Sequence, residues 1–167
     1  MAITKIQSES LNLADDFAFT GTITGAGGNM KPMFSARRTG TFTLNNATSH
    51  TMTYTAEEYD TDNAFDPSTG IFTVPETGKY FFTANFMGDT SWTTSTWVDA
   101  SLQNSNRTGD GIYGAFRNVG YNTRVTGSMS WSATCNINNQ IKVTFYQESG
   151  SNKGITQALF SGFKIIE

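Results

Sequence analysis

Four side chains between residues 60 and 66 carry oxygen atoms of the kind that hard cations bind. They are Asp60, Asp62, Asn63 and Asp66, within the stretch EEYDTDNAFD. Calcium takes several oxygen ligands, mostly from carboxylates and carbonyls. The stretch lacks the glycine and the closing bidentate glutamate of an EF-hand loop. A weak calcium site at Asp60, Asp62 and Asp66 is therefore one hypothesis, and solvated turn carboxylates are the other.

Residues suited to catalysis are sparse. The chain has one histidine, His50, and one cysteine, Cys135, and it contains no GxSxG elbow, zinc-ligand spacing or phosphate-binding loop. Adjacent carboxylates such as Glu57 and Glu58 point to opposite faces when they lie on a strand, so they do not share one acid–base site. We predict no catalytic residues, no cofactor and no enzymatic activity.

Aromatic side chains in glycine- and threonine-rich stretches are the better candidates for binding. Trp92 and Trp97 lie in GDTSWTTSTWVD, and Tyr113 and Tyr121 lie in GIYGAFRNVGYN. Exposed rings beside Asp, Asn and Arg groups suit the stacking of sugar rings, which makes a receptor glycan on a host surface one candidate ligand. The alternative is structural: the same rings cap the open ends of a sandwich or fill a subunit interface.

Composition and charge exclude several classes of partner. The net charge is −3 and the eleven basic residues are scattered, whereas binding to a phosphate backbone needs clustered Lys and Arg. No run approaches the roughly 18 apolar residues of a membrane span. A single cysteine forms no internal disulfide, and one histidine beside it does not complete a zinc site. We expect neither nucleic-acid binding nor membrane insertion.

The elements that must position these residues are strands. From Met33 onward, short alternating runs are separated by turn clusters at intervals of about eight to twelve residues, the spacing of an all-β sandwich or barrel. One run, 71–86, predicts a core hairpin with its turn at 75–78. The alternation also predicts that Cys135 is a small buried residue on one strand face. The predicted inward positions are Phe72, Val74, Tyr80, Phe82, Ala84, Phe86, Val98, Ala100, Leu102, Ile141, Val143 and Phe145.

Two strands carry aromatic residues on both faces. Phe81 lies opposite the predicted core face of its strand, and Phe160 lies on the other side of its strand from Leu159 and Phe163. An outward row of aromatic rings on a monomer would leave an apolar patch in water, and a symmetric oligomer would cover it. We therefore predict a homo-oligomer with Phe81, Phe160 and Phe163 at its interface.

Three segments carry a family resemblance. They are PMFSARRTG, YDTDNAFDPSTGIFTVPETGKYFFTANF and the closing FSGFKIIE, between Pro32 and Glu167. This part of the chain resembles the head domain of complement component one, q subunit, within the tumour-necrosis-factor-like jelly-roll superfamily. The resemblance implies an antiparallel jelly-roll β-sandwich whose first and last strands are adjacent, assembled as a homotrimer around a threefold axis.

Residues 1–31 differ from the rest and predict an attachment arm with a glycine-rich hinge, ahead of a head domain at 32–167. The arm is similar to leader segments of fibre and other structural proteins of marine bacterial viruses. Together the two resemblances imply a virion protein of a fibre, tail or capsid surface that binds other virion proteins through residues 1–31, with contact to the host surface as a further expected role. Pure capsid decoration without host attachment is one alternative, and a secreted lectin-like or cytokine-like ligand is another.

Overall fold

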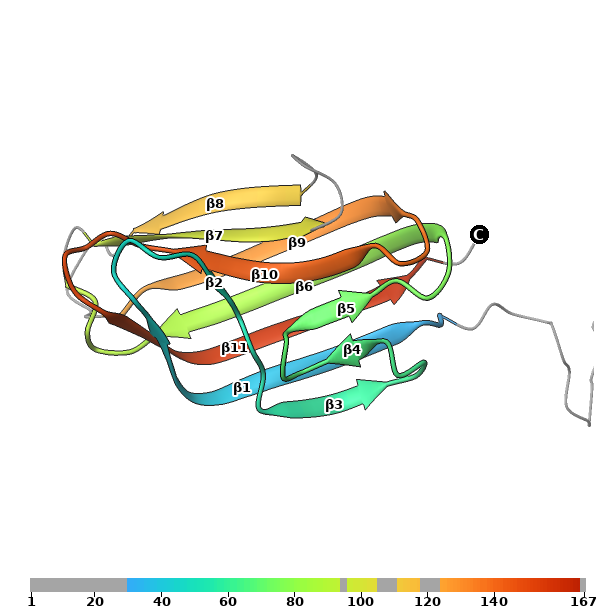
Figure 1. Ribbon diagram of the computed structural model, residues 1–167, viewed down its shortest axis with the longest axis horizontal. Coiled ribbons are helices and arrows are strands. Elements are labelled where there is room, and N and C mark those ends of the chain that lie inside the picture. The colour runs from blue at the N-terminus through green and yellow to red at the C-terminus, as the bar shows by residue number, and fades with distance from the viewer. Residues whose placement is uncertain (1–29, 94–95, 105–110, 118–123, 166–167) are drawn as a thin grey trace, which may run out of the picture.

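The computed structural model describes residues 30–93, 96–104, 111–117 and 124–165 of the 167-residue chain, and at Tyr113, Ala115 and Arg117 it describes the backbone alone. These residues form eleven strands and no helix, so none of them lies in a helix that could cross a membrane. The strands build two sheets that pack face to face (Figure 1).

One sheet, called the β1 sheet below, has the strand order β3-β1-β11-β6-β9. Its strands are β1 (Met33–Leu44), β3 (Ala56–Asp60), β6 (Gly78–Gly88), β9 (Thr126–Cys135) and β11 (Lys153–Lys164). The other, called the β10 sheet, has the order β4-β5-β10-β7-β8, and β2 also pairs with β10. Its strands are β2 (His50–Thr51), β4 (Phe65–Asp66), β5 (Ile71–Thr73), β7 (Trp97–Asn104), β8 (Gly111–Arg117) and β10 (Gln140–Tyr146).

Neighbouring strands are antiparallel throughout both sheets, and the first long strand, β1, pairs with the last, β11. The predicted all-β antiparallel sandwich is confirmed. Period-two alternation explains why these segments form strands, because it gives each strand one apolar face to bury against the facing sheet. The twelve positions predicted to face inward are all buried, and Cys135 is buried as predicted.

An aromatic cluster centred on Phe34 joins the two sheets. The Phe34 ring stacks on Phe65 and Phe72 of the β10 sheet, with centroids 4.8 and 4.5 Å apart, and meets Phe160 of the β1 sheet edge-on at 4.8 Å. Rings at these separations gain favourable quadrupole contacts beyond the area that they bury. The cluster thus holds β1, β4, β5 and β11 in one core.

The predicted hairpin at 71–86 is wrong, although its inward residues are right. β5 belongs to the β10 sheet and β6 to the β1 sheet, so residues 74–77 cross from one sheet to the other. The Tyr80 hydroxyl donates a 2.7 Å hydrogen bond to the Glu76 carbonyl and fixes this crossing. Alternation identified the buried face correctly because both strands contribute to the same core from opposite sides.

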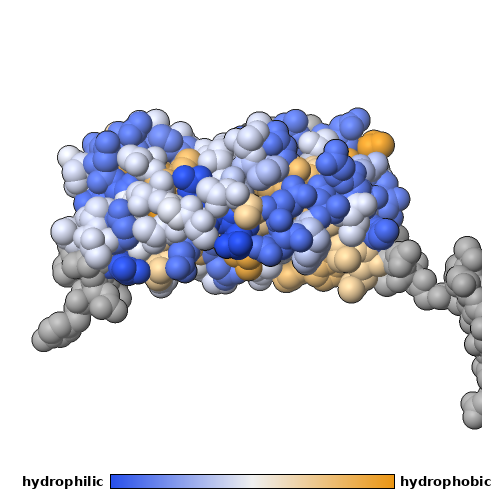
Figure 2. Space-filling view, turned by 90° about the horizontal axis from the view of Figure 1, so that it is seen from below, coloured by the Kyte–Doolittle hydropathy of each residue, from blue (hydrophilic) through white to orange (hydrophobic). Residues whose placement is uncertain are grey.

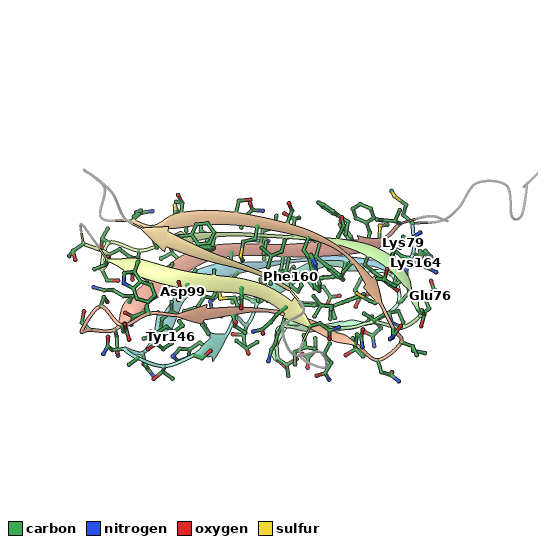
Figure 3. All side chains as sticks on the ribbon, turned by 90° about the horizontal axis from the view of Figure 1, so that it is seen from above. Glu76, Lys79, Asp99, Tyr146, Phe160 and Lys164 are labelled. Carbon is green, nitrogen blue, oxygen red and sulfur yellow. The ribbon has the colours of Figure 1, made fainter. Side chains whose placement is uncertain are left out.

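The prediction that Phe160 lies at a subunit interface is also wrong. Its side chain is completely buried in the core, as Figure 3 shows, and it packs against Phe34 and Phe65. Gly162 lies two residues further along the same inward face. A Cβ there would come within 2.4 Å of the Phe82 ring, so a glycine is needed for the close approach of that ring.

Replacing Phe160 by alanine should lower the free energy of unfolding by about 3 to 5 kcal/mol, because the change empties a fully packed position between the sheets. Ile137, whose side chain is 55% exposed, gives the matched control: Ile137→Ala should change stability by less than about 0.5 kcal/mol. Urea unfolding at one fixed protein concentration measures both. Equal effects of the two substitutions would contradict the placement of Phe160.

Candidate functional site

The outer face of the β1 sheet carries an apolar row at one end. Residues directly opposite each other on antiparallel strands share a face, and the register aligns Met33 with Phe163 and Phe163 with Phe81. All three side chains are partly exposed, and the Phe81 and Phe163 rings lie 5.6 Å apart. Figure 2 shows pale orange side chains along its lower right rim, at the end where β1 begins and β11 ends.

A row of five hydroxyl-bearing residues runs beside the apolar row. The register aligns Tyr59, Ser35, Ser161, Thr83 and Ser130 across all five strands of the β1 sheet. The Ser35 and Ser161 hydroxyls are 3.0 Å apart and hydrogen-bonded, and Tyr59 at the sheet edge is 49% exposed. The row is uncharged, so a protein surface can cover it without desolvating an ion.

The next row includes Arg37, Leu159 and Asn85, and it borders a hollow of about 450 Å³. β1 and β11 both shift register beside this hollow, between Thr39 and Phe42 and between Ile155 and Gln157, and such bulges bend a sheet locally. Leu159 is 38% exposed. Arg37 forms an ion pair with Glu58.

The outer face of the β1 sheet therefore has the properties of an association surface. It combines partly exposed rings, uncharged hydroxyls and one hollow, and the charges nearest its centre, Arg37 and Glu58, neutralise each other. Of the predicted interface residues, Phe81 and Phe163 lie here and touch each other, whereas Phe160 does not. Sequence reasoning missed Met33 and Tyr59, which only the strand register places beside them.

Trp92 is not a surface ligand-binding residue, contrary to the sequence-based prediction. Its side chain is completely buried, and the indole Nε1 donates a 2.8 Å hydrogen bond to the Gly154 carbonyl. Gly88 makes room for it, since a Cβ at that position would lie 2.4 Å from Nε1. Trp92 thus caps the end of the core, which is the structural alternative for this residue.

Trp97 remains at the surface, on the outer face of the β10 sheet. It is partly exposed and lies beside Tyr146, with ring centroids 6.4 Å apart and the planes tilted by 44°. Asp99 on β7 is the register partner of Tyr146. The Tyr146 hydroxyl donates a 2.9 Å hydrogen bond to Glu148 Oε2. Sequence reasoning missed Tyr146, although its outward position follows from the alternation of β10.

Two further predicted binding residues and most of the predicted arm are not placed. The Tyr113 side chain, Tyr121 and residues 1–29 lie outside the described residues. Their sequence-based roles stay predictions.

The three aspartates of the calcium hypothesis bond to turn residues instead of converging. Asp60 accepts backbone hydrogen bonds from Asp62 at 3.1 Å and Phe65 at 2.7 Å. Asp66 accepts two from Ser68, which lower the pKa of its carboxyl. Within the described ranges, no three His, Cys, Asp or Glu side chains are grouped to hold a metal ion. The described side chains therefore do not form a preassembled carboxylate site, and calcium binding at Asp60, Asp62 and Asp66 stays a prediction.

Comparison with solved structures gives the class of fold. The globular domain of zebrafish complement 1qA superposes with a TM-score of 0.61 at 19% identity, covering 82% of this chain and 99% of that one. The PRD1 vertex protein P5 superposes with a TM-score of 0.59 at 14% identity, covering 83% and 100%. At such identities the likeness shows the fold alone, which is the predicted jelly roll.

The family follows from the sequence. The C1q domain model matches residues 33–165, so the chain belongs to the C1q-domain family. This confirms the resemblance read from the three segments. Comparison with curated proteins gave no match.

The two tryptophans should respond differently to substitution by phenylalanine. Trp92→Phe removes a buried hydrogen bond and leaves a void, so it should lower the free energy of unfolding by about 1 to 3 kcal/mol. Trp97→Phe keeps a ring at a partly exposed site and should change it by less than about 0.5 kcal/mol. Denaturant unfolding compares them, and the reverse order would contradict the placement of both rings.

Proposed function

We propose that this chain is a structural protein of a virus particle. Its C1q domain forms a homotrimer through the outer face of the β1 sheet, and residues 1–31 attach the trimer to other virion proteins. The role is non-enzymatic, and the site is a fibre, tail or capsid surface. The observation that carries the proposal is the apolar row of Met33, Phe163 and Phe81, which a solitary subunit leaves partly in water.

Copies of the same chain are the occupants that best fit this face. The row is apolar, the neighbouring row is uncharged, and Arg37 in the next row is paired with Glu58. The apolar and hydroxyl rows themselves carry no charge that would select an oppositely charged partner. The outer face of the β10 sheet, by contrast, exposes Asp99 and carries Lys142.

The viral setting draws its support from two sources. The fold is shared with the whole compared chain of the PRD1 vertex protein P5, and residues 2–28 resemble leader segments of viral structural proteins. A second candidate is a secreted ligand of the same superfamily, favoured by the likeness to the zebrafish complement domain. The two functions share the trimer and differ in what the arm does.

The substitution Phe81→Glu should dissociate the trimer, because it places a charge in the apolar row beside Phe163. Sedimentation velocity should find the unaltered chain near 55 kDa, about three times its 18.2 kDa mass, and the variant near the monomer mass. Ile137→Glu is the matched control, since it puts the same charge on an exposed apolar residue away from the row, and it should stay trimeric. An unaltered chain that sediments as a monomer would overturn the proposal.

Removal of residues 1–31 should abolish incorporation into particles while leaving the head trimeric, because the interface lies within the head domain. Immunoblotting of purified particles from a host that supplies the truncated or the full chain measures incorporation. If the truncated chain is incorporated as well as the full one, the arm is not the attachment segment. If the full chain never enters particles and is found in the medium, the secreted ligand is correct instead.

A further inference from the structure

The outer face of the β10 sheet holds an aromatic pair flanked by two carboxylates. Trp97 and Tyr146 form the pair, 6.4 Å apart and tilted by 44°, so the two rings present an angled surface. Asp99 faces outward beside Tyr146, and Glu148 accepts the Tyr146 hydroxyl hydrogen bond through one carboxylate oxygen. The four residues are called the Trp97 site below.

Neither carboxylate of the Trp97 site is neutralised by a described cation. Asp99 is exposed and forms no hydrogen bond or ion pair through its side chain with any described residue, and among the described residues the Glu148 carboxylate bonds Tyr146 alone. The negative surroundings also act on Tyr146: the hydrogen bond to Glu148, and then desolvation and the charges of Glu148 and Asp99, raise the pKa of its phenol.

Three hydrogen-bonded polar side chains lie next to the aromatic pair on the outer face of the β10 sheet. Next along the same face, the Ser101 and Thr144 hydroxyls are 2.6 Å apart, and the Gln103 amide donates a 2.8 Å bond to Thr144. Ser101 and Thr144 are both buried on paired strands, so these hydrogen-bonded side chains have fixed positions. Side chains that are already fixed lose little entropy when a ligand binds beside them.

We propose that the Trp97 site binds an arginine side chain of a partner protein. A guanidinium is planar, stacks on the negative face of aromatic rings and donates paired hydrogen bonds to a carboxylate. The site supplies both features, with the rings of Trp97 and Tyr146 and the carboxylate of Asp99, which bonds no described side chain. Complementary charge is the reason for choosing a cationic side chain over a neutral ligand.

The position of the site indicates an external partner. Figure 3 shows Asp99 and Tyr146 together at the end of the molecule opposite Glu76 and Lys164, and β1 begins at that opposite end (Figure 1). A head attached through residues 1–31 would therefore present the Trp97 site away from its attachment. This orientation rests on the proposed function, whereas binding of the guanidinium does not.

The test uses the full ¹⁵N-labelled chain and the indole N–H signals of its three tryptophans. The probe is a capped tetra-arginine peptide at low salt, and capped tetra-citrulline is its neutral isostere. We expect tetra-arginine to shift the Trp97 signal alone, because Trp92 is buried and Trp131 lies on another strand. Tetra-citrulline should cause no shift.

Two charge-removing variants separate the site from general attraction to an acidic protein. Asp99→Asn should weaken tetra-arginine binding about two- to five-fold, as expected for loss of one exposed charge contact. Asp62→Asn removes the same charge from an exposed turn away from the site and should leave the affinity unchanged.

Three results would overturn the inference: equal shifts with both peptides, equal effects of the two variants, or a Trp97 signal that moves with chitotriose and not with tetra-arginine. The last would assign the site to a saccharide. Sedimentation of the same sample reports the oligomeric state separately, so a monomer that still binds tetra-arginine would contradict the proposed function and leave this inference standing.

Discussion

The packing of rings around Phe34 is the interaction on which the rest of the structure depends. Phe34 contacts Phe65, Phe72 and Phe160, so one cluster ties strands of both sheets together. Because alternate residues of a strand point to opposite faces, placing Phe34 and Phe160 inside forces Met33 and Phe163 outside. The apolar row on the outer face is thus a direct consequence of how the core is filled.

The outer faces of the two sheets differ in their side chains, and the proposals assign them different roles. The β1 sheet presents an apolar row and an uncharged hydroxyl row, which suit permanent contact between copies of the chain. The β10 sheet presents rings beside carboxylates that no described cation neutralises, which suit a transient contact with a charged partner. In the proposals made above, assembly and recognition therefore use opposite faces of one fold.

Alternation was enough to predict most of the core but not which of two apolar faces turns inward. Phe160 and Phe163 lie on opposite sides of β11, and counting apolar neighbours did not decide between them. Gly162 was the usable signal, because it shares a face with Phe160 and lets Phe82 pack closely there. The burial of Trp92 was missed for a related reason. Its polar neighbours indicate a loop, and only the folded chain shows that Gly88, four residues earlier, leaves the space that the indole fills.

Strand pairing beyond nearest neighbours was not predictable from the sequence. The local sequence at 74–77 is typical of a hairpin turn. The pairing of β5 with β10 and of β6 with β11 shows instead that this segment joins two sheets. The same long-range register brings Tyr59 and Met33 beside Ser35 and Phe163 on the outer face of the β1 sheet, and it brings Tyr146 to Trp97. The candidate sites therefore emerge from contacts between residues far apart in the sequence.

The most direct measurement is a density map of the assembled protein at side-chain resolution. We expect three copies around one axis, with Met33, Phe81 and Phe163 of each copy in contact with a neighbour and shielded from solvent. A map in which these side chains stay in water, while another face of the sandwich makes the contacts between copies, would contradict the account.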